Sequence, residues 1–297
     1  MRIAHLTLDA ILSISCRIGH CAAGARALVA GIYLKGLLGA SLLIATSGCF
    51  SATSPQASAV STYSVGACNP LPCAKITIAT LPDLPDTFAP AAVATIRHRV
   101  DDALYAPLED TEQAITRERL IEGVQAQYDD YMTVKDSETV VDWQLSRSAF
   151  IVFANEDFAS LVVKNEGYLG GAHGFSDEQL FVFDGKSGKL LTWDDILSPG
   201  SREVFVRAAE AEFRRARDIK PGQSLEDAGF TFEGGAFTLS RNFAVTDRGI
   251  SLHYNPYEVG PYVMGATDCM VPMDVARPAL NLDVTNLAAV GPSGGLL

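Results

Sequence analysis

The first 49 residues combine scattered basic side chains with a short apolar run that ends in small residues. They contain one acidic residue, Asp9, and four basic ones, Arg2, Arg17, Arg26 and Lys35. The apolar run covers residues 36–45 and is followed by Thr46-Ser-Gly-Cys49. This order is typical of a secretory signal, and the run is too short to span a bilayer. We therefore expect residues 1–49 to be a leader and the folded part to begin after it.

The last four residues of this leader resemble a lipobox, in which the cysteine is lipidated and becomes the new N-terminus. The sequence thus predicts an exported lipoprotein, anchored in a membrane through Cys49 and facing the periplasm. A lipobox usually has leucine three places before the cysteine, where this chain has Thr46. Cleavage at another point, without lipid, stays open as an alternative.

The segment after the leader is low in complexity. Residues 51–64 are rich in Ser, Ala, Thr and Pro and carry no charge, so we expect residues 50–70 to be a flexible tether. The remaining chain, about 230 residues, suffices for one sizeable domain or two small ones. We expect an N-terminal subdomain over residues 71–175, a C-terminal one over 176–280 and a tail over 281–297.

The charge of this remaining part is strongly negative. The whole chain has 23 basic and 35 acidic residues, and the leader holds four and one of them, so 19 and 34 remain and the net charge is −15. Nucleic-acid binding requires basic patches and is therefore not expected. An acidic surface favours solubility, and it also attracts cationic partners by long-range steering.

Three cysteines follow Cys49, namely Cys68, Cys73 and Cys269. Export places them in an oxidising compartment, where a pair is expected to form a disulfide. Cys68 and Cys73 can close a tight loop that contains two prolines, which would leave Cys269 as a buried thiol. The alternative joins Cys269 to either of the other two. No second CxxC or nearby histidine supports a metal site, and we expect neither metal nor cofactor.

The pattern of apolar residues predicts more strands than helices. The helices are expected over residues 86–104, capped by Asp86 or Thr87, and over 111–132 and 201–217. The strands are expected over residues 75–81, 140–163 (as two or three strands with a hairpin at 155–157), 180–183, 236–245, 250–254 and 271–273. These elements lack a regular βαβ alternation. The fold class is therefore α+β, with antiparallel sheets and a few packed helices.

The segment Tyr168-Leu-Gly-Gly-Ala-His-Gly174 is unusually rich in glycine. Glycines permit positive φ and close backbone approach, so the segment could contact a ligand through Tyr168, Gly170, Gly171 and His173. The alternative is a tight crossover in which His173 forms hydrogen bonds within the protein. Of the two interpretations, the structural one is favoured.

A second unusual segment is His253-Tyr-Asn-Pro-Tyr-Glu-Val-Gly-Pro-Tyr262. Rigid, aromatic loops recur in binding surfaces because they lose little entropy on association. The candidate ligand-binding residues in this segment are Tyr254, Asn255, Pro256, Tyr257, Glu258 and Tyr262. The alternative, a packed turn with internally bonded tyrosine hydroxyl groups, is equally compatible with the sequence.

Motifs of known enzyme classes are not found. The sequence has no GxSxG, no HExxH and no P-loop, and only His98, His173 and His253 follow the tether. An acid/base pair of Glu258 and His173, as in a cell-wall-directed hydrolase, would require the two unusual segments to meet. We therefore expect a protein that is not an enzyme and keep the hydrolase as the alternative.

Taken together, the two unusual segments and residues 183–197 between them resemble the RsiV-like family. The middle piece is Phe183-Asp-Gly-Lys-Ser-Gly-Lys-Leu-Leu-Thr-Trp-Asp-Asp-Ile-Leu197, and the last piece contains the stretch Asn255-Pro-Tyr-Glu258 followed by Gly265. The order and spacing of the three pieces cover roughly residues 75–275.

The resemblance implies an extracytoplasmic α+β module without established catalysis. In the best-understood members it is the outer part of a membrane-anchored anti-sigma factor that binds lysozyme, a cationic enzyme, and it also occurs ahead of peptidoglycan deacetylase domains. Neither a sigma-binding segment nor a deacetylase domain is recognisable in this sequence, so we do not carry the signalling role over. We hypothesise a non-catalytic binding module for an envelope protein or glycan, with a cationic lysozyme-like protein among the candidate partners. A purely structural envelope protein is a third possibility.

Overall fold

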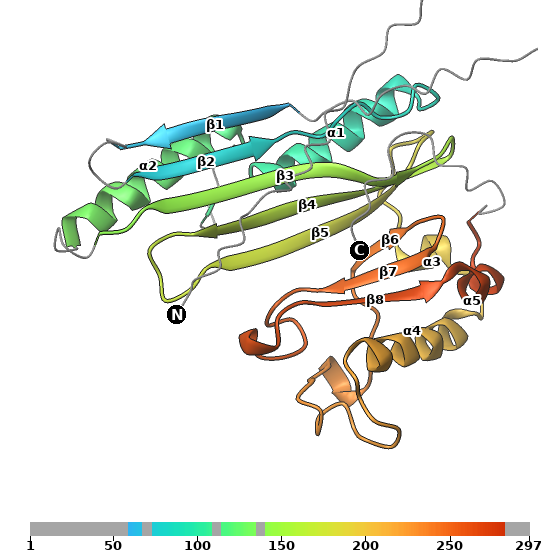
Figure 1. The fold of residues 1–297 in the computed structure, drawn as a ribbon. Coiled ribbons are helices and arrows are strands. Elements are labelled where there is room, and N and C mark those ends of the chain that lie inside the picture. The colour runs from blue at the N-terminus through green and yellow to red at the C-terminus, as the bar shows by residue number, and fades with distance from the viewer. Residues whose placement is uncertain (1–58, 67–72, 109–113, 135–139, 283–297) are drawn as a thin grey trace, which may run out of the picture. The chain divides into compact units, whose positions relative to one another are not determined.

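Five strands in sequential order form the larger of two sheets in the computed structural model, which describes residues 59–66, 73–108, 114–134 and 140–282 (Figure 1). They are β1 (Val60–Val65), β2 (Ala74–Ala79), β3 (Trp143–Ala154), β4 (Phe158–Tyr168) and β5 (Phe175–Asp184). Neighbouring strands are antiparallel except β2 and β3, which are parallel. A parallel pair needs a long crossover, and two helices lie between these strands in the sequence.

The two crossover helices cover one face of the five-stranded sheet (Figure 1). They are α1 (Pro90–Leu104) and α2 (Arg117–Val134). Their buried residues recur every four positions, namely Ala92, Ile96, Val100 and Leu104 in α1 and Leu120, Val124 and Tyr128 in α2. This spacing places one apolar stripe of each helix against the sheet. The predicted cap at Asp86 or Thr87 is wrong, because α1 begins at Pro90, whose fixed φ suits the first helical position.

The smaller sheet has the order β6–β7–β8 and is antiparallel throughout. Its strands are β6 (Asn242–Val245), β7 (Gly249–Tyr254) and β8 (Thr267–Pro272). The helix α4 (Arg202–Ala216) packs against β8 (Figure 1). The short helix α3 (Trp193–Ile196) precedes α4 in the sequence, and the short helix α5 (Met273–Ala276) follows β8. The ring of Phe213 on α4 lies in an aromatic core with Phe230, Phe232, Phe237 and Tyr254.

Hydrogen bonds of three side chains join the two sheets, and no backbone ladder pairs β5 with β6 in the part of the chain that the structure describes. We call these side chains, those of Ser160, Asn242 and Asn255, the side-chain seam. The hydroxyl of Ser160 on β4 donates to the carbonyl oxygen of Val245 (2.7 Å) and accepts from its amide (2.9 Å). Both residues are buried, so the Ser160 hydroxyl satisfies backbone groups of Val245 that a β-ladder between the sheets would otherwise pair.

Two asparagines complete the seam on the outer edge of β5. The amide of Leu180 donates to Oδ1 of Asn242 (3.3 Å). The side chain of Asn255 forms two bonds with one residue, since its Oδ1 accepts from the amide of Glu178 (2.8 Å) and its Nδ2 donates to the carbonyl oxygen (2.9 Å). An asparagine side chain thus occupies the place that a neighbouring strand would take.

The structure confirms the predicted α+β class with antiparallel sheets, and it corrects two boundaries. The tether predicted over residues 50–70 is wrong over β1, which pairs with β2 along its full length. The boundary predicted between residues 175 and 176 falls inside β5, after its first residue, and the ten residues of β5 pair with β4. The second half of the chain therefore contributes a strand to the first sheet. The described residues belong to one compact unit.

The leader with Cys49, the cysteine Cys68 and most of the predicted tail lie outside the described residues. Cys269 on β8 is buried and free, so the alternative that joined it to Cys68 or Cys73 is wrong. Cys73 is disulfide-bonded. Its pairing with Cys68 stays a prediction. None of the helices formed by the described residues is both long and apolar enough to cross a membrane.

Candidate functional site

The glycine-rich segment forms the connection between β4 and β5. Gly170 adopts a φ of +74°, and a Cβ atom there would lie 2.7 Å from Nε1 of Trp143 and 2.8 Å from the ring of Tyr131. Only glycine fits so close to these aromatic rings. Tyr168 is half-buried at the end of β4, and the surroundings of Gly171 are open. Glycine is therefore required at position 170 by packing within the protein, as the interpretation of this segment as a tight crossover expects.

The two unusual segments meet through His173 and Tyr262. Their rings are stacked, with centroids 4.0 Å apart and an interplanar angle of 21°. The Tyr262 hydroxyl donates to the carbonyl oxygen of Gly174 (2.7 Å), and Nδ1 of His173 lies 2.7 Å from the same oxygen. A carbonyl oxygen can only accept, so Nδ1 carries a proton. Two loops that are far apart in sequence form one surface.

Exposed apolar side chains extend this surface. The side chain of Tyr257 is 67% exposed with its ring centroid 5.5 Å from that of Tyr262, and Val263 is 89% exposed. Tyr257 has a φ of +70°, which is uncommon for a residue other than glycine. The amide of Glu258 donates to the carbonyl oxygen of Asn255 (3.0 Å), so Tyr257 occupies a turn position that usually holds glycine. We call His173, Tyr257, Tyr262 and Val263 the aromatic surface.

Two predicted contact residues serve the fold. Tyr254 is only 1% exposed and its hydroxyl donates to the carbonyl oxygen of Thr238 (2.7 Å), so its ring is not available to a ligand. Burial raises the pKa of Tyr254 well above its usual range. The carboxylate of Glu258 accepts from the amide of Asn255 (2.8 Å) and from the Ser240 hydroxyl (3.2 Å), so it closes the turn that presents Tyr257.

The acid/base pair considered for a hydrolase is not assembled. Glu258 directs its two oxygens to Ser240 and Asn255, while His173 contacts Tyr262 and Gly174. No hydrogen bond or ion pair joins His173 to Glu258 in the part of the chain that the structure describes. The two loops meet, as the hydrolase alternative required, but through His173 and Tyr262.

An open pocket of about 400 Å³ borders the aromatic surface at Tyr262 and Val263. Its wall includes the acidic side chains of Asp177, Glu178 and Asp268 together with His253 and Asn255. We call this hollow the acidic pocket. Groups of three or more His, Cys, Asp or Glu placed to hold a metal ion were not found among the described residues.

His253 is a deeply buried titratable group of this pocket, and its side chain is only 4% exposed. Its Nδ1 lies 2.7 Å from Oδ1 of Asp268, and its Nε2 lies 3.0 Å from Oδ1 of Asn255. Burial alone would lower the pKa of His253, but the hydrogen bond and charge of Asp268, with Glu178 and Asn255, outweigh burial and raise it. Neither His253 nor Asp268 was predicted from the sequence as a site residue. Their pairing follows from the register of β7 and β8, in which they lie opposite each other.

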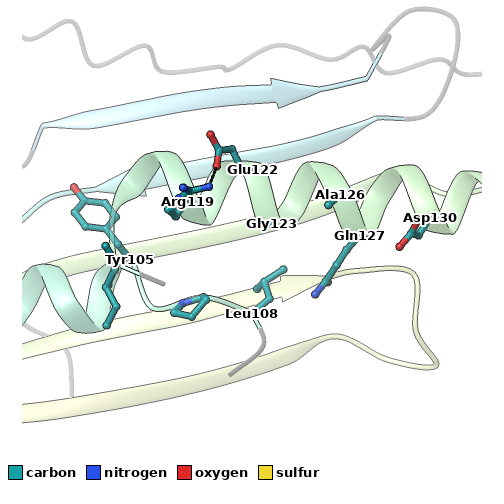
Figure 2. A pocket seen from close by; sticks show the side chains of 11 residues that line it. Tyr105, Leu108, Arg119, Glu122, Gly123, Ala126, Gln127 and Asp130 are labelled. Carbon is teal, nitrogen blue, oxygen red and sulfur yellow. Dashed lines mark hydrogen bonds and ion pairs between the residues drawn. The ribbon is translucent and has the colours of Figure 1, made fainter. Parts of the chain in front are cut away.

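A second pocket, of about 390 Å³, lies along α2 (Figure 2). Its lining includes Tyr105, Leu108 and the mutually paired Arg119 and Glu122, whose side-chain atoms lie 2.8 Å apart. Its lining residues Leu108 and Ala114 stand on either side of residues 109–113 in the sequence, which lie outside the described residues. We therefore do not consider it a candidate site.

The fold and the site define an α+β protein with a five-stranded and a three-stranded sheet, an aromatic surface and an adjoining acidic pocket. Residues 194–274, which include α4 and β6–β8, match the family described as "Protein of unknown function (DUF3298)". No curated protein matches the chain.

Two solved structures share the fold. A member of the DUF3298 family from Bacteroides fragilis NCTC 9343 is 16% identical with a TM-score of 0.56, and the match covers 76% of this chain and 96% of that one. A DUF3298 family protein from Pseudomonas aeruginosa PAO1 is 18% identical with a TM-score of 0.50, covering 76% and 94%. Similarity at these identities establishes the fold alone.

Proposed function

We propose that this protein is a non-catalytic binding module that recognises a protein or glycan of the cell envelope through the aromatic surface. The observation that carries the proposal is the junction of His173 and Tyr262, which holds two loops together by a ring stack and a hydrogen bond. Because the surface is preorganised, a partner would lose little affinity to the ordering of loops. The exposed rings and Val263 supply apolar contact area.

The acidic pocket favours a partner with cationic groups. Asp177 and Asp268 line it beside the aromatic surface, and the chain beyond residue 49 has 19 basic and 34 acidic residues. Complementary charge steers a cationic partner toward such a surface. The resemblance to the RsiV-like family makes a cationic lysozyme-like protein the first candidate, and muropeptides are the glycan candidates.

Export as a lipoprotein belongs to the same proposal, with Cys49 as the lipidated residue. The basic leader, the apolar run and the small residues before Cys49 support it. Metabolic labelling with a palmitate analogue should mark the wild-type protein and not a Cys49→Ala variant. Labelling that survives this substitution would contradict the assignment of Cys49.

The binding proposal can be tested by titrating a lysozyme and soluble muropeptides into the purified protein in a calorimeter. We expect Tyr257→Ala and Val263→Ser to weaken binding by tenfold or more while the melting temperature changes by only a few degrees, because both side chains are exposed. Val204→Ser, at an exposed position of α4, is the matched control and should bind as the wild type does.

Other outcomes of the same experiment would overturn the proposal. The absence of any saturable ligand would favour a structural envelope protein. Turnover of peptidoglycan fragments that is lost in His173→Ala would favour the hydrolase, although His173 and Glu258 have separate hydrogen-bond partners in this structure.

A further inference from the structure

The ring of His253 connects the smaller sheet to the edge of the larger one. The residue lies on β7, its Nδ1 faces Asp268 on β8, and its Nε2 faces Asn255. Asn255 in turn forms two hydrogen bonds with the backbone of Glu178 on β5. The state of the imidazole ring therefore bears directly on one of the three contacts of the side-chain seam.

The bonds to Glu178 fix which way the Asn255 amide points. A backbone N–H can only donate and a backbone carbonyl can only accept. Oδ1 of Asn255 must therefore face the Glu178 amide, and Nδ2 must face the carbonyl oxygen. Because His253 Nε2 lies against the same Oδ1, an acceptor, Nε2 has to carry a proton.

The other ring nitrogen also faces an acceptor, the carboxylate of Asp268. With a hydrogen on each nitrogen, His253 is an imidazolium that donates on both sides. A neutral ring would turn a lone pair toward an oxygen atom, either that of Asn255 or that of Asp268. One of the two contacts would then be lost.

The surrounding charges favour the imidazolium. Asp268 on β8 faces the ring. Asp177 and Glu178 on β5 belong to the wall of the same pocket. Glu178 is paired with Lys164 of β4 at 2.5 Å. Further charged groups nearby are Glu258 in the loop after β7, linked through Ser240 to the His253 carbonyl oxygen, and Arg215 of α4, which lines a neighbouring pocket with Asp268 and is paired with Glu212. On β6 the residue opposite His253 is the uncharged Asn242. Acidic groups thus outnumber basic ones around the ring.

We propose that His253 is a pH-dependent latch, whose protonated ring holds Asn255 on the edge of β5 and so fixes the wall shared by the acidic pocket and the aromatic surface. Loss of one ring proton removes the hydrogen bond of His253 to either Asn255 or Asp268. The consequence for ligand affinity rests on the proposed function, whereas the latch itself does not.

The direction of the pH dependence follows from the geometry and the charges. The folded protein holds the proton more tightly than the unfolded chain does, so the pKa of His253 lies above the ordinary value of about 6.5. The contribution of the latch to stability is complete below about pH 6.5 and disappears as the pH rises through the pKa of the folded state.

Amide hydrogen exchange measured by NMR on the purified protein provides the test. We expect the protection factor of the Glu178 amide, which corrects for intrinsic exchange, to fall by roughly fivefold as the pH rises through this pKa, the size expected for one hydrogen bond. The Leu180 amide is an internal control, because it is held on the same strand by Asn242 without a titrating partner. Its protection factor should stay constant.

Two variants make the test specific. His253→Gln should abolish the pH dependence at Glu178, and His98→Gln, at an exposed histidine of α1, should leave it unchanged. If His253→Gln fails to fold, Asp268→Asn serves instead, because removal of this charge should move the transition to lower pH.

The outcomes separate the latch from the binding proposal. If the protection factor of the Glu178 amide stays as constant as that of Leu180 across pH 5–9, the latch is overturned even if ligands bind. A transition that Asp268→Asn does not move would overturn it as well. A pH-dependent Glu178 amide in a protein that binds no lysozyme or muropeptide would support the latch and overturn the proposed function.

Discussion

The hydroxyl group of Tyr262 donates a 2.7 Å hydrogen bond to the carbonyl oxygen of Gly174, 88 residues earlier in the chain. This bond links the short turn of 3₁₀ helix at Tyr262–Met264 to the connection between β4 and β5. The same tyrosine ring stacks on His173, so one side chain fastens two loops in two ways. The contact gives the aromatic surface its definite shape.

Tyr262→Phe separates the hydrogen bond from the ring stack. We expect the free energy of unfolding to fall by about 1 kcal/mol, because one partly buried hydrogen bond is lost and the ring remains. Urea denaturation measures this change. Tyr257→Phe, at an exposed ring, is the control and should change it by less than about 0.5 kcal/mol. Equal losses in the two variants would show that the Gly174 contact does not stabilise the fold.

Ser160→Ala tests the side-chain seam. The substitution removes a hydroxyl that serves both the amide and the carbonyl oxygen of Val245 in a buried place. Because both backbone groups lose their partner, we expect a loss of about 2–3 kcal/mol in the free energy of unfolding, measured by chemical denaturation. Ser148→Ala on β3, at a half-buried site, should cost less than about 0.5 kcal/mol. A cost at Ser160 as small as at Ser148 would contradict the role of the seam.

Arg147→Lys tests a buried cation of the larger sheet. The guanidinium of Arg147 donates to the carbonyl oxygens of Leu104 and Ala106 and to Oδ1 of Asn165, and burial lowers its pKa to about 10. A lysine cannot reproduce this fork, so we expect a loss of about 2 kcal/mol or more on chemical denaturation. Arg119→Lys, in an exposed ion pair, should be near neutral. Equal effects of the two substitutions would refute the prediction.

Cys269 should be inert in the folded protein. Burial raises the pKa of its thiol to about 12, so very little reactive thiolate exists near neutral pH. We expect iodoacetamide at pH 8 to leave the Cys269 peptide unmodified in the native protein and to alkylate it fully in denaturant, as read by peptide mass spectrometry. Rapid alkylation of the native protein would show that β8 opens readily.

Much of the secondary structure was predictable because it depends on local patterns. The apolar periodicity of residues 86–104 predicted α1, whose buried stripe includes Ile96, Val100 and Leu104. The turn at residues 155–157 predicted the hairpin of β3 and β4, where the Asn155 side chain accepts from two backbone amides. The strand β1 was missed because its composition continues the Ser/Thr-rich segment before it. Most residues of this edge strand alternate between exposed and half-exposed, so its apolar pattern in the sequence is weak.

The site was predictable only in part. The sequence identified both loops, but their junction at His173 and Tyr262 depends on packing between distant segments. Tyr254 was misassigned because all six residues of β7 are buried, so alternation along this central strand does not separate inner from outer side chains. The pair of His253 and Asp268 becomes visible only once the register of β7 and β8 is known.

The side-chain seam also has a consequence for the order of folding. The strands β3, β4 and β5 are sequential antiparallel neighbours, so their pairing closes short loops at little entropic cost. The contact of Ser160 with Val245 closes a loop of 85 residues and gains only two hydrogen bonds. We therefore expect the β3–β5 meander to form early and the smaller sheet to dock late, which makes docking the step that limits the refolding rate.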